Sequence, residues 1–198
     1  MPSVLVFSDI HNDQQALARL MQVEADYYIC AGDLVTFAKG FEKMAPHMLP
    51  KKDRVYIIPG NHESESDIAG FCAAHGFQNL HGRTLEINGT TVAALGYSNI
   101  TPFHTPGEYS EEELTRRLAP FAGHKPLVLV CHCPPKDTAL DRIKEGLHAG
   151  SPAVRKFIEE VQPTHFFCGH IHEGEGAVVQ MGATRAMNVG KPGYLLEL

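Results

Sequence analysis

The chain has 198 residues, of which 43% are hydrophobic and 20% are charged. This length and composition predict a single globular domain over residues 1–198 and exclude a repeat array or a largely disordered chain. Seventeen basic and 23 acidic side chains give a net charge of −6, which argues against a broad nucleic-acid surface and favours a small-molecule partner. No heptad pattern indicates an oligomeric state.

No apolar stretch reaches the roughly 20 residues that a membrane helix requires, so no membrane partner is expected. The first residues lack the basic segment of a secretory signal, which favours a cytoplasmic location. The five cysteines are an odd number and are predicted to be buried, unpaired side chains. Histidine is the unusual residue, because 12 are present and imidazole is both a common metal ligand and an acid or base near neutral pH.

Three strand-like runs alternate with helical segments in the first third of the chain. A helix capped by Asp13 is predicted after the first run, and a second helix is predicted over residues 41–48. Strands that alternate with helices in this way are typical of an α/β fold. The runs are residues 4–7, 27–31 and 55–58, and they are followed by Asp9, Asp33 and Asn61, respectively.

The middle of the chain contains a predicted β-hairpin, because Asn88-Gly89 separates two β-branched runs. A long loop over residues 96–107 precedes a helix that Ser110 opens, and a second helix begins after Ser151. Further strands are predicted, and these are residues 84–87, 90–94, 127–131, 164–168, 177–181, 184–188 and 194–198.

Five of the predicted strands end in residues that commonly bind metal ions. Because ligands of α/β sheets bind outside the carboxyl ends of the strands, we expect these five loops to converge on one site. An isolated Asp or His in such a position is more often a turn former, but five together indicate a metal centre. The residues are Asp9 and His11, Asp33, Asn61 and His62, His132, and His170 with His172.

The donor types predict a centre with two divalent ions, because carboxylate, amide oxygen and imidazole are present without thiolate. Asp33 stands alone on its loop and is the candidate bridge between ions about 3.5–4 Å apart. Two such ions would attract an anion and generate a hydroxide near neutral pH, which suits phosphoester hydrolysis. His62 is then the candidate proton donor to the leaving group, and Glu63 is expected to orient it.

These motifs occur in the order found in calcineurin-like metallophosphoesterases, which the chain resembles over essentially its whole length. More narrowly, the chain resembles the short Icc-related phosphoesterases. The resemblance implies a four-layer α-β-β-α sandwich in which helices flank two mixed β-sheets, with the metals at one edge. The motifs are Asp9-x-His11, Gly32-Asp33, Gly60-Asn61-His62-Glu63, His132 and Gly169-His170-x-His172.

The resemblance also implies how the ligands divide between two ions. One ion would be held by Asp9, His11, Asp33 and His172, and the other by Asp33, Asn61, His132 and His170. His62 corresponds to the family's histidine that contacts the phosphate or the leaving group without binding metal. One departure is Val189, which stands between Asn188 and Gly190 where the family usually has proline.

The predicted function is therefore metal-dependent hydrolysis of a small soluble phosphoester, with a phosphodiester favoured, by attack of a metal-bound hydroxide. Manganese or iron is favoured, and zinc, nickel and cobalt are alternatives that the same ligands accept. Alternative functions are a phosphomonoesterase, a protein Ser/Thr phosphatase and a non-catalytic binding scaffold of the same fold. Two further histidines, His104 and His148, are candidates for substrate contact because of their loop positions.

Overall fold

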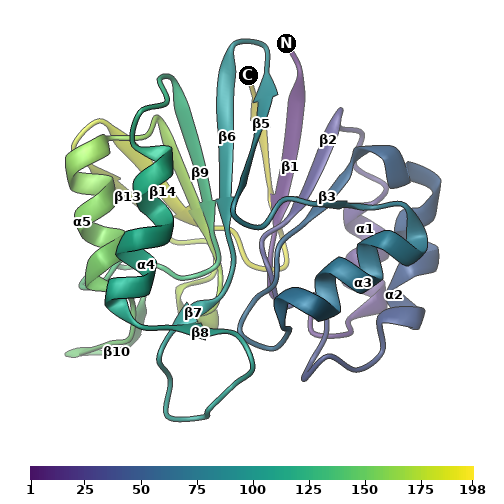
Figure 1. The fold of residues 1–198 in the computed structure, drawn as a ribbon, viewed down its shortest axis with the longest axis horizontal. Helices are drawn as coiled ribbons and strands as arrows, with labels where there is room; N and C mark the ends of the chain where they lie inside the picture. Colours follow the sequence, from purple (N-terminus) through teal and green to yellow (C-terminus); the bar gives the residue numbers. More distant parts are fainter.

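The computed structural model describes residues 1–198, and the first part of the chain, together with its last strand, builds one sheet with helices on its outer face (Figure 1). The strands of this sheet are β1 (Ser3–Phe7), β2 (Tyr27–Cys30), β3 (Val55–Ile57), β4 (Gln78–Asn79) and β15 (Tyr194–Glu197). The helices are α1 (Gln14–Leu20), α2 (Phe41–Met48) and α3 (Glu65–His75), and a 3-10 segment, η1 (Leu49–Arg54), follows α2.

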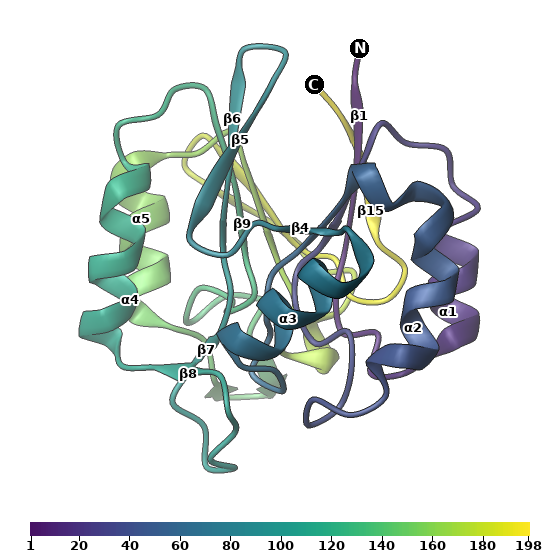
Figure 2. The ribbon, with the colours of Figure 1, turned by 45° about the vertical axis from the view of Figure 1, so that its right-hand side comes forward.

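The second part builds another sheet, which α4 (Glu111–Leu118) and α5 (Pro152–Val161) cover on the opposite side of the molecule (Figure 2). Its strands are β5 (Arg83–Ile87), β6 (Thr90–Leu95), β9 (Leu127–Cys131), β12 (His165–Cys168), β13 (Val178–Met181) and β14 (Thr184–Asn188). Shorter elements are β7 (Ser98–Asn99), β8 (Glu108–Tyr109), β10 (Arg142–Lys144), β11 (Leu147–His148), η2 (Ala119–Phe121) and η3 (His172–Gly174).

Both large sheets are mixed. The first has the order β15-β1-β2-β3-β4, in which β15 alone is antiparallel to its neighbour. The second has the order β13-β14-β12-β9-β6-β5, in which the two edge strands are antiparallel and the inner strands are parallel. Two mixed sheets between layers of helices confirm the expected four-layer sandwich.

The hydrophobic core follows the alternation of side chains along the strands. In β1, Val4 and Val6 belong to the cluster between the two sheets, whereas Leu5 and Phe7 belong to the cluster beneath the helices of the first sheet. A third cluster lies between the second sheet and its two helices. Because each sheet buries both faces, its central strands are almost uniformly apolar.

Most predicted elements are confirmed, including the hairpin, where Asn88 and Gly89 have positive φ angles of 49° and 77°. Two larger elements escaped prediction, besides the two-residue strands β4, β7 and β8 and the 3-10 segments. The first is α3, which Ser64 opens with a capping box, and the second is the small β10–β11 hairpin. All five cysteines are buried and free, as expected. None of the helices has the length and hydropathy needed to cross a bilayer.

Candidate metal centre

The predicted site residues come together where β1, β2, β3, β9 and β12 end. Backbone bonds continue past the strands, because Asp9 N donates to Gly32 O at 3.1 Å and His11 N donates to Asp33 O at 2.9 Å. The two sheets meet at the same place, where His170 N donates to both carboxylate oxygens of Asp9 at 3.1 Å. The expected convergence of five loops is therefore present.

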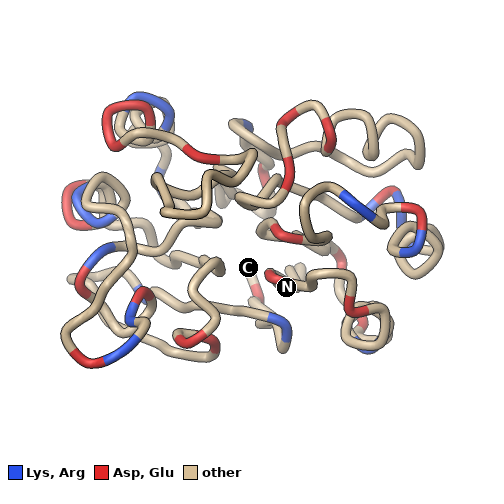
Figure 3. The backbone as a smooth tube through the Cα atoms, turned by 90° about the horizontal axis from the view of Figure 1, so that it is seen from below, with Lys and Arg blue, Asp and Glu red and all other residues tan.

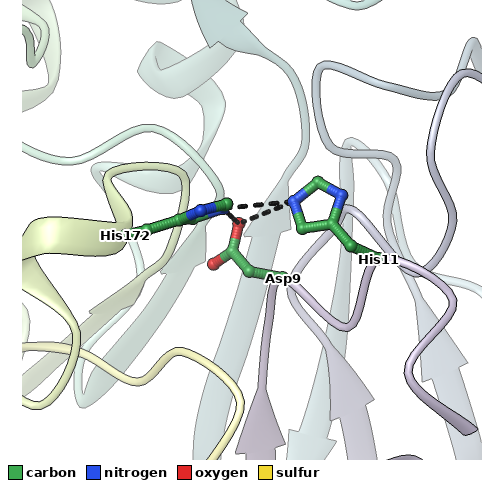
Figure 4. Close-up of side chains that lie close together, drawn as sticks. All are labelled: Asp9, His11 and His172. Carbon is green, nitrogen blue, oxygen red and sulfur yellow. Dashed lines mark hydrogen bonds and ion pairs between the residues drawn. The ribbon is translucent and has the colours of Figure 1, made fainter.

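Asp9, His11 and His172 form the first group of donor atoms (Figure 4). His172 Nε2 lies 3.1 Å from His11 Nε2 and 3.6 Å from Asp9 Oδ1. The distance between His11 Nε2 and Asp9 Oδ1 is 3.9 Å. The donor atoms of the three side chains thus point toward one small volume, although the residues come from both ends of the chain.

Asp33, His132 and His170 form a second group, to which Asn61 adds an amide oxygen. Asn61 Oδ1 lies 3.1 Å from His132 Nε2 and 2.8 Å from His170 Nδ1. Asp33 Oδ2 lies 3.4 Å from His132 Nε2. This group is more deeply buried than the first, because His132 is fully enclosed.

Asp33 lies between the two groups. Its Oδ2 atom is 3.5 Å from His11 Nε2 and 3.4 Å from His132 Nε2, while its Oδ1 atom accepts the backbone N–H of His62 at 2.9 Å. The same carboxylate oxygen therefore faces both groups of donors, and the other oxygen holds the side chain in place.

His62 lies beside the first group. Its ring centroid is 5.0 Å from that of His11 and 4.6 Å from that of Phe37, and both ring pairs meet edge to face. His62, His11 and Asp33 also lie close enough together to form a third possible set of donors. His62 Nδ1 accepts the backbone N–H of Phe37 at 3.4 Å.

Glu63 does not orient His62, contrary to the expectation from the sequence. Its buried carboxylate accepts the backbone N–H groups of Gly60 at 2.7 Å, Val35 at 2.9 Å and Asp33 at 3.1 Å. The Glu63 side chain is fully buried, and its hydrogen-bond partners are these backbone N–H groups and not the imidazole of His62. Glu63 instead joins the loops that follow β2 and β3.

The partners that orient the donor imidazoles and the Asn61 amide could not be found from the sequence. Backbone Ala31 O lies 2.8 Å from His132 Nδ1, and Thr36 Oγ1 lies 3.2 Å from His11 Nδ1. Asn61 Nδ2 donates to Thr105 Oγ1 at 3.2 Å. Each contact leaves the opposite nitrogen or oxygen of the side chain facing the centre.

Asn188 supports the loop that carries His170 and His172. Its buried amide nitrogen donates to Ile171 O at 2.9 Å and to Gly169 O at 3.3 Å. Val189 N, at the departure from the family pattern, donates to Cys168 O at 2.8 Å, a bond that proline could not form.

Four of the candidate donors lie in the left-handed region of the backbone. Their φ angles are 57° at Asp9, 46° at His11, 54° at Asp33 and 70° at His170. Asp and His adopt this region more readily than most residues. At these four positions the left-handed backbone accompanies side chains that face the centre.

The protonation of the imidazoles depends on burial and on the two carboxylates. Burial lowers the pKa of His170 to about 4, helped by nearby His132, and burial also lowers the pKa of His11. Burial opposes the charged form of His132 as well, but the Asp33 carboxylate raises the pKa of His132 to about 9. A hydrogen bond to Asp9 raises the pKa of His172.

The pKa values of the two aspartates are lowered. Although burial raises the pKa of Asp33, the neighbouring His132 and His11 hold that pKa well below its usual range. The pKa of Asp9 is likewise lowered, because His172 and His132 outweigh burial. Ionised carboxylates beside neutral imidazoles are the donor set of a divalent metal centre, and binding at His132 and His172 would release protons.

Two cavities flank the centre and share His11, His62 and His172. One has a volume of about 580 Å³ and is otherwise lined by Asp9, Glu175 and Lys191. The other has a volume of about 410 Å³ and extends beneath the loop of residues 100–103. His104 and His148 line neither cavity, and His148 Nδ1 instead lies 2.7 Å from Asp141 Oδ1.

Comparison with known proteins shows which proteins the chain is similar to in sequence and in fold. The chain is 31% identical over 202 residues to the uncharacterized protein MJ1162 of Methanocaldococcus jannaschii, and the match covers 98% of this chain and 90% of the relative. Its fold is similar to that of TT1561 from Thermus thermophilus, with a TM-score of 0.66 and 19% identity, over 96% of this chain and 89% of that one.

Two further solved structures share the fold. The phosphopantetheinyl hydrolase PptH of Mycobacterium tuberculosis has a TM-score of 0.66 and 15% identity, and the match covers 96% of this chain and 89% of that one. A dimetal phosphatase of Danio rerio has a TM-score of 0.61 and 13% identity, over 94% of this chain and 87% of that one. The profile of the calcineurin-like phosphoesterases matches residues 2–174, and the chain therefore belongs to this family.

Proposed function

We propose that the chain is a phosphoesterase that binds two divalent metal ions and hydrolyses a small phosphoester, with a phosphodiester preferred. The observation that carries this proposal is the position of Asp33 Oδ2, 3.5 Å from His11 Nε2 and 3.4 Å from His132 Nε2. One oxygen placed between two sets of donors suits a ligand shared by two ions.

The proposed ligands divide as the family resemblance implies. Each set combines carboxylate, imidazole and, in the second set, an amide oxygen, which suits manganese or iron and is also compatible with zinc, nickel or cobalt. Two divalent ions held there would polarise the phosphoryl oxygens and supply a nucleophile at neutral pH. The first set is Asp9, His11, Asp33 and His172, and the second is Asp33, Asn61, His132 and His170.

His62 is the proposed proton donor. Because its Nδ1 atom accepts the backbone N–H of Phe37, Nε2 is the ring nitrogen left to act on a substrate, and it would transfer a proton from the imidazolium form, which returns to the neutral ring. His62 lines both cavities beside the centre, so this proton can reach the oxygen of a departing alcohol. Proton donation of this kind typically contributes about 10²–10⁴-fold to the rate.

The paired cavities favour a diester over a monoester. A diester has two substituents on phosphorus, and the cavities lie on two sides of the shared histidines. Basic and acidic segments are interspersed in Figure 3 and form no basic stripe there, which agrees with a small substrate in place of a nucleic acid. The likeness to a protein named as a dimetal phosphatase agrees with phosphoester chemistry.

The test measures hydrolysis of bis(p-nitrophenyl) phosphate and p-nitrophenyl phosphate by metal-free protein titrated with manganese. We expect hydrolysis that requires metal, is faster with the diester, and is lost in Asp33→Asn. The matched control is Asp53→Asn, at an exposed position, which should behave as wild type. Faster hydrolysis of the monoester would shift the assignment to a phosphomonoesterase, and two bound metals without turnover would favour a binding scaffold.

A further inference from the structure

The smaller cavity beside the centre has a partly apolar wall, whereas the lining of the larger cavity there has no hydrophobic residue. Ile100 and Phe103 from the loop between β7 and β8 line it, together with Ile143 of β10. Its remaining wall includes Asp33 and Asn61 of the candidate centre. The apolar side chains and the candidate metal ligands therefore border the same 410 Å³ of space.

The apolar side chains of this wall are exposed to solvent. Phe103 is 75% exposed and Ile100 is 67% exposed, so neither contributes to the hydrophobic core. Three of the ten exposed large hydrophobic side chains of the chain line this one cavity. An exposed apolar cluster beside a polar centre is typical of a ligand-binding surface.

The loop of residues 100–107 does not need these side chains to keep its shape. The Glu108 carboxylate accepts Thr101 Oγ1 at 2.6 Å, Thr105 N at 2.9 Å and Thr105 Oγ1 at 2.6 Å. Thr105 Oγ1 in turn accepts the Asn61 amide, which ties the loop to the centre. Polar contacts therefore hold the loop that carries Ile100 and Phe103.

The charges around the cavity indicate what could occupy it. Among its lining residues are the carboxylates of Asp33 and Glu173, but no lysine or arginine. Lys191 lines the other cavity, together with Glu175. A substituent with its own phosphate would therefore meet no lysine or arginine in this cavity and would be repelled by Glu173.

We propose that this cavity binds an uncharged, apolar substituent of the phosphoester, of the size of an aromatic ring, and thereby selects such esters over those with a small or charged substituent. The inference rests on the proposed function, because the phosphoryl group must bind at the adjacent centre. Ile100, Phe103 and Ile143 are then specificity-determining residues, and their contacts with the substituent replace their contacts with water.

The test compares two ligands that carry the same charged group, phenylphosphonate and methylphosphonate. Binding of each to the manganese-loaded protein is measured by calorimetry. We expect phenylphosphonate to bind at least about tenfold more tightly, which corresponds to about 1.4 kcal/mol. Equal affinity of the wild-type protein for the two ligands would overturn the inference.

Substitution then locates the preference. Phe103→Ser and Ile100→Ser should each reduce the ratio of the two affinities while the affinity for methylphosphonate stays unchanged. The matched control is Val178→Ser, at an exposed apolar position on the edge strand β13, which should keep the wild-type ratio. A ratio that is unchanged in both loop variants would assign the preference to another surface.

The absence of tryptophan from the chain allows a second readout that does not depend on turnover. In Phe103→Trp, phenylphosphonate should change the fluorescence of the single tryptophan, and methylphosphonate should leave it nearly constant. In Val178→Trp neither ligand should have an effect. Hydrolysis of a diester without any preference between the phosphonates would refute this inference alone, whereas absence of all hydrolysis would refute the proposed function.

Discussion

The two large sheets contribute different chemistry to the centre that they share. The loops after β1, β2 and β3 supply every oxygen donor of the proposed ligand set, namely Asp9, Asp33 and Asn61, and a single imidazole, His11. The loops after β9 and β12 supply imidazoles only, from His132, His170 and His172. Neither sheet alone could complete either proposed metal site.

This division assigns different tasks to the two halves of the molecule. The first half carries the negative charge that would balance the two proposed cations, and the second half carries imidazoles, of which His132 and His172 would release a proton on binding metal. The two halves share a buried apolar cluster, and polar contacts join them at the centre, including His132 Nδ1 at 2.8 Å from Ala31 O and His170 N bonded to the Asp9 carboxylate. Substitutions in the two halves should therefore have different consequences.

The largest effect is expected from removal of the shared carboxylate. Asp33→Asn should abolish binding of both ions, because the neutral amide would leave both groups of donors without their common charge. The measurement is metal content by elemental analysis after dialysis. For comparison, His132→Gln on the other half should lose only one of the two ions. Two ions retained in Asp33→Asn would contradict the bridging role.

A smaller loss is expected from His62→Ala, which belongs to the first half but lies outside the proposed ligand set. Turnover of bis(p-nitrophenyl) phosphate should fall by about 10²–10⁴-fold while both ions remain bound. Metal content and kcat are measured on the same sample. His104→Ala, at an exposed loop position, is the control and should keep wild-type kcat. Loss of an ion in His62→Ala would identify His62 as a ligand.

Glu63→Ala tests how the first half holds its two metal-binding loops together. Three buried backbone N–H groups lose their acceptor, and the free energy of unfolding should fall by about 3 kcal/mol or more. Urea denaturation of the metal-free protein measures this change. Glu145→Ala, in an exposed turn, should have almost no effect. A similar small effect in Glu63→Ala would show that the turn is held by other contacts.

The smallest effect concerns a junction between the halves outside the proposed ligand set. His81 Nδ1 accepts Gly96 N at 2.9 Å, and burial lowers the pKa of His81 although Glu65 opposes this shift. Below about pH 6.5, His81 binds a proton in the unfolded chain but not in the folded chain. The contribution of His81 to the free energy of unfolding is therefore complete above that pH and decreases toward pH 5.

The stability of wild type and of His81→Gln is compared by urea denaturation at pH 7 and pH 5. The other histidines contribute equally in the two proteins, so the difference isolates His81. The variant should lose less stability on acidification, by about 1 kcal/mol for each unit by which the pKa is lowered. An identical loss in the two proteins would mean that His81 accepts its proton in the folded state.

The strand ends of the centre could be predicted because they depend on local sequence. A short apolar run followed by Asp or His is visible without knowledge of the fold, and parallel strands end at one edge. The division of the strands between two sheets could not be derived in this way, because β15, at the other end of the chain, joins β1 in the first sheet and not the strands that precede it in the sequence. That part of the prediction came from the family resemblance.

The sequence did not predict α3 and the β10–β11 hairpin because neither shows a clear pattern of apolar residues. In α3, Ile68, Phe71 and Cys72 are buried, but alanines and a glycine surround them and no apolar stripe is visible. The β10–β11 hairpin is exposed and carries Arg142 and Lys144, so no alternation marks it. The predicted role of Glu63 was wrong because its partners are backbone N–H groups. Every residue except proline has such a group, so the sequence does not indicate which ones Glu63 binds.

The left-handed backbone at Asp9, His11, Asp33 and His170 has a consequence for protein engineering. Copying these side chains onto the strand ends of another scaffold would not reproduce the centre, because ordinary turns direct them elsewhere. A transplant would have to include the turns themselves and the buried groups that hold them, such as Glu63 and Asn188. The unit to transplant is therefore the whole set of loops together with the buried side chains that hold them, and the seven donor residues alone would not be enough.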